Sequence, residues 1–137
     1  MSKRSDDDLA RRWHDLMSSY HHVSCVLDRT LQESHGVTAS EFAILEQLAD
    51  AADHSLRMHE LGEHAHVTQS AVSRLVARLE ADGLVSRKMC TEDRRVVWTC
   101  LTPEGLGLYR SARPAQREVL RSVLADAASD SEVRAGR

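Results

Sequence analysis

Side chains suited to contacts with a nucleic acid gather in two short stretches of the sequence. They are Thr68, Gln69, Ser70, Ser73, Arg74 and Arg78, followed by Arg87, Lys88, Arg94 and Arg95. Arginine can bond to two acceptor atoms of guanine and glutamine can bond to adenine, while hydroxyl groups and cations bind phosphate oxygens. We therefore predict that these residues contact double-stranded DNA.

Charge is distributed unevenly along the 137 residues. The whole chain carries 18 basic and 21 acidic residues, a formal net charge of −3. Residues 1–60 hold six basic and 11 acidic side chains, whereas residues 68–95 hold six basic and only four acidic ones. DNA responds to the local arrangement of cations rather than to the total charge. The pattern is compatible with DNA binding, although an ordinary solvated surface would explain it equally well.

A helix is expected to present the first stretch. Apolar residues recur at i, i+3, i+4 and i+7, the spacing of one helix face, at Val72, Leu75, Val76 and Leu79. Thr68 suits the N-cap position and Asp82-Gly83 ends the pattern, so the predicted helix spans Gln69–Ala81. If the apolar face packs into the core, the polar residues lie on the opposite face. This helix is the predicted reader of the major groove.

A β-hairpin is expected to present the second stretch. Residues 84–89 and 96–101 are two strand-like runs joined by a polar loop. Arg94 and Arg95 fall at the hairpin tip, where an arginine can enter the narrow minor groove of DNA. Asp93 is predicted to hold one of these arginines in place rather than to face phosphate.

Further elements must position the helix and the hairpin. A helix of two turns is expected over Met58–Ala65, after a short extended segment at Ser55-Leu56, and it completes a winged helix-turn-helix. Thr38-Ala39-Ser40-Glu41 is a capping box that starts another helix, and Thr102-Pro103-Glu104 starts the last one. The fold predicted is mainly α-helical with a small β-hairpin wing.

The first helix is expected to be unusually long, from about Asp6 to His35. Its apolar stripe comprises Leu9, Trp13, Leu16, Tyr20, Val23, Leu27 and Leu31. So small a chain cannot readily cover this stripe by itself, which predicts a second copy as its cover. The chain is thus read as one integrated domain with three parts: dimerisation helix 1–36, DNA-binding region 37–102, and dimerisation helix with a short tail 103–137.

Three linked motifs resemble the MarR (multiple-antibiotic-resistance regulator) family. They are Leu61-Gly62-Glu63 with residues 68–76, residues 79–85, and Glu92-Asp93-Arg94-Arg95 followed by residues 101–105, and the match covers about residues 9–128. The resemblance implies a homodimer held by the first and last helices that binds a pseudo-palindromic operator. It also implies a repressor released by a small ligand or an oxidant near the junction of the dimerisation and DNA-binding regions. One departure is the short C-terminus, since residues 129–132 could begin the family's closing helix but the chain ends five residues later.

Eight histidines and three cysteines raise the question of a ligand or metal site. His14, His21 and Cys25 share the first helix and are the candidates for a pocket that binds the effector. Zinc needs three or four converging ligands, and no pair of histidine or cysteine motifs supplies them, so we predict no metal site. A metal-responsive regulator of the same fold remains an alternative.

Cys25 could sense oxidants only if its thiol had a lowered pKa and were accessible to the oxidant. A packed, inert thiol is the simpler interpretation.

Other classes of protein find less support in the sequence. No nucleophile elbow, HExxH motif or phosphate-cradling glycine loop occurs, so we predict neither an enzyme nor a bound cofactor. The cysteines lack disulfide spacing, and no signal peptide or long apolar run is found, so we expect a cytoplasmic protein without membrane contact. A winged-helix module that binds proteins instead of DNA is the main rival, and it has no need of arginines at the wing tip.

Overall fold

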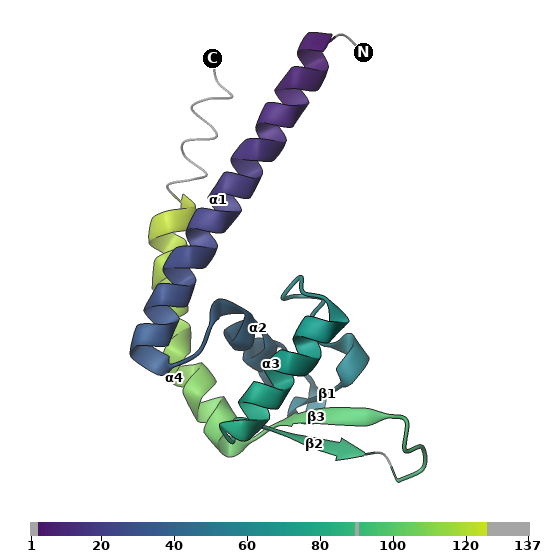
Figure 1. The fold of residues 1–137 in the computed structure, drawn as a ribbon. Coiled ribbons are helices and arrows are strands. Elements are labelled where there is room, and N and C mark those ends of the chain that lie inside the picture. The colour runs from purple at the N-terminus through teal and green to yellow at the C-terminus, as the bar shows by residue number, and fades with distance from the viewer. Residues whose placement is uncertain (1–2, 90, 126–137) are drawn as a thin grey trace.

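A computed structural model describes residues 3–89 and 91–125, apart from the side chain of Arg4. In chain order the elements are α1 (Lys3–His35), α2 (Ala39–Asp50), the 3-10 turn η1 (Ala52–His54), β1 (Ser55–Arg57), the 3-10 turn η2 (Met58–Glu60), α3 (Gln69–Ala81), β2 (Val85–Met89), β3 (Val97–Leu101), α4 (Pro103–Val119) and the π-helical turn η3 (Leu120–Leu124). In Figure 1, α1 is a long rod with α4 beside it, and α2, α3 and the sheet form a compact unit at its base. The predicted fold class is confirmed: a winged helix.

The core lies where α2 and α3 meet the sheet and α4. Phe42, Leu45 and Leu48 of α2 pack with Val72 and the other buried residues of α3. The remaining members include Leu31, Val37, Ile44, Leu61, Val76, Leu79, Val85, Tyr109 and Ala112. The apolar face predicted for Gln69–Ala81 is therefore the buried face, and it leaves the polar face of α3 in solvent.

The helix starts are fixed by the caps that the sequence predicts. Thr38 accepts a hydrogen bond from the Glu41 backbone N–H at 3.1 Å, and the Glu41 carboxylate accepts one from the Thr38 N–H at 3.3 Å. Thr102 caps α4 in the same way by accepting from the Gly105 N–H at 3.0 Å. Each such cap satisfies backbone donors that the first turn leaves unpaired, at a gain of about 1 kcal/mol.

The wing is part of a three-stranded antiparallel sheet with strand order β1-β3-β2. In the register of the sheet, Trp98 lies between Arg57 of β1 and Lys88 of β2. Residues directly opposite one another share a face, so these three side chains lie on one side of the sheet. The buried Thr99 belongs to the other side, which faces the core.

One predicted element is wrong: Met58–Ala65 is not a regular helix. Only Met58–Glu60 is helical, as a single 3-10 turn, and residues 61–66 form consecutive turns. Gly62 has a φ of +94° and His66 a φ of +54°, values that an α-helix cannot contain. A Cβ on Gly62 would also lie 2.4 Å from the Val72 side chain, so the chain turns tightly against α3 at this point. The Val67 N–H closes the turn onto the Gly62 carbonyl at 3.3 Å.

The apolar stripe of α1 is only partly covered within one chain. Leu31 is fully buried and Leu27 half-buried, but Leu9, Trp13, Leu16 and Tyr20 are between 47% and 66% exposed. The exposed members lie on the part of α1 that extends beyond the compact unit in Figure 1. No described helix is long and apolar enough to cross a membrane. Cys90 and the closing segment at residues 129–132 lie outside the described residues.

Candidate nucleic-acid interface

The outer face of α3 is polar, exposed and rigidly placed. Gln69, Ser70, Ser73, Arg74 and Arg78 are all exposed, while Val72, Val76 and Leu79 on the other side of the helix are fully buried. Thr68 is the N-cap, and its hydroxyl accepts from the Ala71 N–H at 3.2 Å. The hydroxyl is therefore already engaged in fixing the helix start, close to where a phosphate could approach the free backbone N–H groups.

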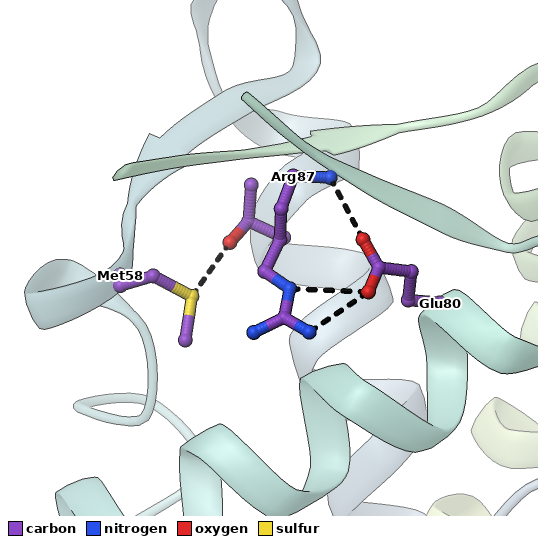
Figure 2. A network of polar contacts seen from close by, with 4 residues as sticks. Met58, Glu80 and Arg87 are labelled. Carbon is purple, nitrogen blue, oxygen red and sulfur yellow. Dashed lines mark hydrogen bonds and ion pairs between the residues drawn. The ribbon is translucent and has the colours of Figure 1, made fainter. Parts of the chain in front are cut away.

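Arg87 is tied to α3 by a short ion pair. Its Nη2 and Nε donate to Glu80 Oε1 at 2.8 and 3.2 Å, and its backbone N–H donates to Glu80 Oε2 at 3.2 Å. Figure 2 shows the Arg87 side chain turned toward Glu80, with Met58 on the opposite side. The hydrogen bonds and charge of Arg87 lower the pKa of the Glu80 carboxyl, and Glu80 raises the pKa of Arg87. This contact joins the first wing strand to the last turn of α3.

The charged side chains at the wing tip are exposed to solvent. Asp93 Oδ1 accepts from the Arg95 backbone N–H at 3.0 Å and from Arg95 Nε at 3.4 Å. The Arg95 side chain is nevertheless 94% exposed, and Arg94 and Lys88 are exposed too. The structure thus brings Asp93 to Arg95, while the guanidinium remains available to a partner.

A hollow of about 460 Å³ lies between α3 and the wing, and we call it the wing hollow. It is lined by Arg57, Met58, His59, Gln69, Ser73, Arg87, Arg95, Val96 and Val97. Three of these residues are arginines and none is acidic. The hollow therefore joins the polar face of α3 and the base of the wing into one cationic surface.

Met58 and Gln69 connect the walls of the wing hollow. The Thr99 hydroxyl donates to the Met58 sulfur at 2.8 Å, and Gln69 Nε2 donates to the Met58 carbonyl at 3.2 Å. The turn at Met58 is thus bound to the third strand on one side and to the start of α3 on the other. Gln69, predicted to read adenine, thus has one amide N–H engaged inside the protein.

Comparisons with known proteins identify this architecture. The sequence model of the MarR family matches residues 35–96. The crystal structure of Sco3205 from Streptomyces coelicolor, a MarR family transcriptional regulator solved in complex with DNA, superposes with a TM-score of 0.80 at 32% identity. The superposition covers 89% of this chain and 75% of that one. The chain belongs to the MarR family.

Other MarR-type relatives agree over the same region. AbsC, a MarR family regulator from Streptomyces coelicolor, superposes with a TM-score of 0.77 at 26% identity over 92% of this chain and 82% of that one. The repressor YetL of Bacillus subtilis is 35% identical over 89 residues, which are 65% of this chain and 53% of YetL. The homoprotocatechuate degradative operon repressor of Escherichia coli is 30% identical over 95 residues, 69% of this chain and 63% of that repressor. The match thus spans between half and two thirds of these two curated relatives.

A second hollow, of about 430 Å³, lies where α1 and α2 meet α3 in this MarR chain, and we call it the junction hollow. Its lining comprises Asp28, Thr38, Ser40, Val67, Ala71, Arg74, Leu75 and Arg78. Arg78 Nε lies 4.0 Å from Oε1 of the fully buried Glu41, whose Oε2 has no hydrogen-bond partner among the described residues. Arg74 and Arg78 therefore border both the exposed face of α3 and a cavity behind it.

His14, His21 and Cys25, the candidates for an effector pocket, lie elsewhere on the MarR fold. All three are exposed on α1, and none lines the wing hollow or the junction hollow. The Cys25 side chain is exposed, so the expectation of a packed thiol is wrong. Its Sγ lies 3.6 Å from His21 Nε2. Within residues 3–89 and 91–125, no group of three or more histidine, cysteine or acidic side chains is placed to hold a metal ion.

Arg57 is one of the residues lining the wing hollow that the sequence did not reveal. It lies at the end of β1, outside both polar stretches, and it lines the wing hollow. Its guanidinium carbon is 5.4 Å from the centroid of the Trp98 ring. Only the pairing of β1 with β3 brings Arg57 to Trp98, 41 residues later, and no local motif signals that pairing.

Proposed function

We propose that this chain binds double-stranded DNA as a homodimer and regulates transcription, most simply as a repressor. The observation that carries the proposal is the continuous cationic surface formed by the polar face of α3, the wing hollow and the exposed Arg94 and Arg95. A helix of the width of α3 fits the major groove, and an arginine-bearing wing fits the adjacent minor groove. The relation to the DNA-bound regulator Sco3205 supports the same function. The proposed role is not enzymatic.

Each protomer is proposed to use its residues in distinct ways. Arg74 and Gln69 read base edges, whereas Ser70, Ser73 and Arg78 approach the bases or phosphates beside α3. Arg94, Arg95 and Lys88 bind the minor groove and its phosphates. Two copies of α3 related by a two-fold axis would read half-sites about 10 base pairs apart, centre to centre. Residues 1–36 and 103–137 are proposed to hold the dimer, and residues 37–102 to bind the DNA.

The junction hollow is the site we propose for a small-molecule effector. It lies behind α3 between the elements assigned to DNA binding and to dimerisation, and two arginines and two hydroxyl groups line it. A ligand that bound there could move α3 relative to α1 and thereby change the affinity for DNA. The exposed His21 and Cys25 line neither the junction hollow nor the wing hollow.

Selection of binding sites from a pool of random duplexes tests the function directly. The selected duplex is then titrated against the wild type and the Arg74→Ala and Arg95→Ala variants. Loss of a bidentate guanine contact costs about 1–3 kcal/mol, so Arg74→Ala should weaken binding and relax the base preference at one position. Arg95→Ala should weaken binding to all duplexes and reduce its dependence on salt.

Arg110 is an exposed residue of α4, outside the cationic surface proposed to bind DNA. Arg110→Ala therefore serves as the control, because it removes the same charge elsewhere on the protein. A pool that yields no enriched sequence, or equal affinities for both variants and the wild type, would favour the protein-binding module instead. Repeating the titration with a phenolic acid, zinc and hydrogen peroxide tests the effector, because only a genuine effector changes the affinity of intact protein.

A further inference from the structure

His59 lies in the wing hollow, between the two parts of the surface that are proposed to enter DNA. A helix in the major groove and a wing in the neighbouring minor groove straddle the sugar-phosphate strand that separates those grooves. In the proposed complex that strand passes over the hollow, because Gln69 and Ser73 of α3 line one side of it and Arg95 and Val97 of the wing line the other. A side chain that opens into the hollow therefore meets phosphates rather than base edges.

The contacts of the η2 turn direct the His59 side chain away from the sheet. In a 3-10 turn such as η2, three consecutive side chains point about 120° apart. The first, Met58, points to the core-facing side of the sheet, where its sulfur accepts a hydrogen bond from the Thr99 hydroxyl at 2.8 Å. The third, Glu60, points toward Arg57, with 4.0 Å between Oε1 and Nε. His59, the second, takes the remaining direction and is exposed to solvent.

The backbone on both sides of His59 is fixed to helices of the DNA-binding region. Gln69 Nε2 donates to the Met58 carbonyl at 3.2 Å, so His59 directly follows a residue that is bound to the start of α3. Gln47 Nε2 of α2 donates to the Glu60 carbonyl at 2.9 Å. A side chain on a backbone held in this way loses less conformational freedom when it binds a phosphate than one on a mobile loop would.

No acidic side chain lines the hollow to partner a protonated His59. The α3 residues in its lining are uncharged, and the cations Arg87 and Arg95 are paired with carboxylates at 2.8 and 3.4 Å. The carboxylate next to His59 in the chain, that of Glu60, is directed to Arg57. A DNA phosphate over the hollow supplies a negative charge there and so favours the protonated imidazole. The turns that follow η2 add exposed side chains that do not line the hollow: Glu63, His64 and His66.

We propose that protonated His59 binds a phosphate of the DNA strand between α3 and the wing, so that the affinity for DNA rises as the pH falls from 8 to 6. This inference rests on the proposed function and adds a contact outside both polar stretches of the sequence. Imidazole changes its charge in this pH range, whereas the arginine and lysine contacts stay charged throughout it. Because the complex binds more protons than the free protein and DNA do, a lower pH favours the complex.

The dependence of DNA affinity on pH and on salt tests this contact. The wild type and His59→Gln are titrated at pH 6 and at pH 8, over a range of salt concentrations, with the selected duplex and with a scrambled duplex of equal length. Each phosphate contact contributes about 0.9 to the slope of log affinity against log salt, so the slope of the wild-type dimer should be larger at pH 6 by up to about 1.8. We expect the wild type to bind both duplexes roughly tenfold more tightly at pH 6, and His59→Gln to change by less than about twofold.

Two further variants separate the charge of His59 from its place in the fold. His59→Arg is charged at every pH, so at pH 8 it should bind DNA about as tightly as the wild type does at pH 6. His22→Gln removes an exposed imidazole from α1 and should keep the wild-type dependence on pH. Thermal unfolding of each variant at both pH values detects any loss of folding.

The outcomes distinguish this contact from the proposed function. A His59→Gln variant that keeps the wild-type dependence on pH would overturn the contact and assign the proton uptake to another group, even where Arg74→Ala shows that α3 reads DNA. A pH dependence confined to the selected duplex would also overturn it, because a phosphate contact carries no sequence information. So would a wild-type affinity that is equal at pH 6 and pH 8. A wild-type chain that binds neither duplex overturns the contact and the proposed function together.

Discussion

Tyr109 links the helix that supports DNA binding to the helix assigned to dimerisation. Its ring packs on Phe42 at 5.4 Å between centroids, and its hydroxyl donates to Glu46 Oε2 at 3.1 Å. Arg117 Nη2 donates to the same carboxylate oxygen at 2.8 Å. Glu46 therefore neutralises the charge of Arg117 and accepts the hydrogen bond of the Tyr109 hydroxyl. These two contacts bind α2 to α4 where Tyr109 and Arg117 are partly shielded from water.

The ionisation of Tyr109 provides a test of this link. Burial, and then the nearby Glu46 carboxylate, raise the pKa of Tyr109 above its ordinary value of 10.0. A proton held more tightly in the folded state stabilises the fold below pH 10, and this contribution is lost as the pH rises through the raised pKa. The free energy of unfolding of the wild type should fall above pH 10 by up to about 1.4 kcal/mol per pH unit from this group, and less steeply in Tyr109→Phe.

Chemical denaturation between pH 9 and pH 12 measures this difference. Parallel curves for Tyr109→Phe and the wild type would contradict the burial of the phenol against Glu46.

The ion pair between Arg87 and Glu80 matters at the scale of the elements, because it fixes the wing against α3. Two functions are possible for Arg87: it contacts DNA itself, as the sequence predicts, or it holds β2 so that the wing tip reaches its groove. The lowered pKa of Glu80 keeps the pair charged at neutral pH, and the pair is lost only as the pH falls through that lowered value. Glu80→Gln separates the two functions because their expected effects have opposite signs.

If Arg87 positions the wing, Glu80→Gln and Arg87→Gln should each weaken DNA binding, and the double variant should be no weaker than Arg87→Gln. If Arg87 contacts DNA directly, Glu80→Gln frees a cation and removes a negative charge, so binding should strengthen. We expect the first result, with little change in the free energy of unfolding, because the pair is partly exposed to solvent. Glu118 and Arg121 form another exposed ion pair, on the last helical turns. The two single variants and the double variant at this pair are the control. Gel-shift titration of the four proteins decides between the two functions.

Regular elements were predictable from the sequence, whereas contacts that cross between elements were not. The spacing of Val72, Val76 and Leu79 predicts α3, and the capping box at Thr38 predicts the start of α2, because both signals are local. Residues 61–65 were wrongly predicted as helix because the positive φ at Gly62 follows from its close approach to α3. The stacking of Arg57 on Trp98 depends in the same way on strand pairing, so the sequence alone could not reveal it.

The whole molecule presents an apolar surface that a single chain leaves open. Leu9, Trp13, Leu16, Met17 and Tyr20 are 47% to 66% exposed along one side of α1. An apolar patch of this kind on a small protein marks an interaction site, and burying one leucine contributes about 1.5–3 kcal/mol. A second copy of the chain is the cover we propose, since DNA binding by two copies of α3 requires a symmetric pair.

Leu16→Glu tests this interface at its most exposed apolar position. Each dimer would bury two glutamates in place of two leucines, so sedimentation should show a shift from dimer to monomer at micromolar concentration. DNA affinity should fall by at least about 100-fold, because the two half-sites would then be bound independently instead of through one linked pair. Ser18→Glu places the same charge on the opposite, exposed side of α1 and should change neither property. A Leu16→Glu protein that remains dimeric would move the interface away from the first half of α1, and a monomer that keeps full affinity would show that the DNA is bound by single chains.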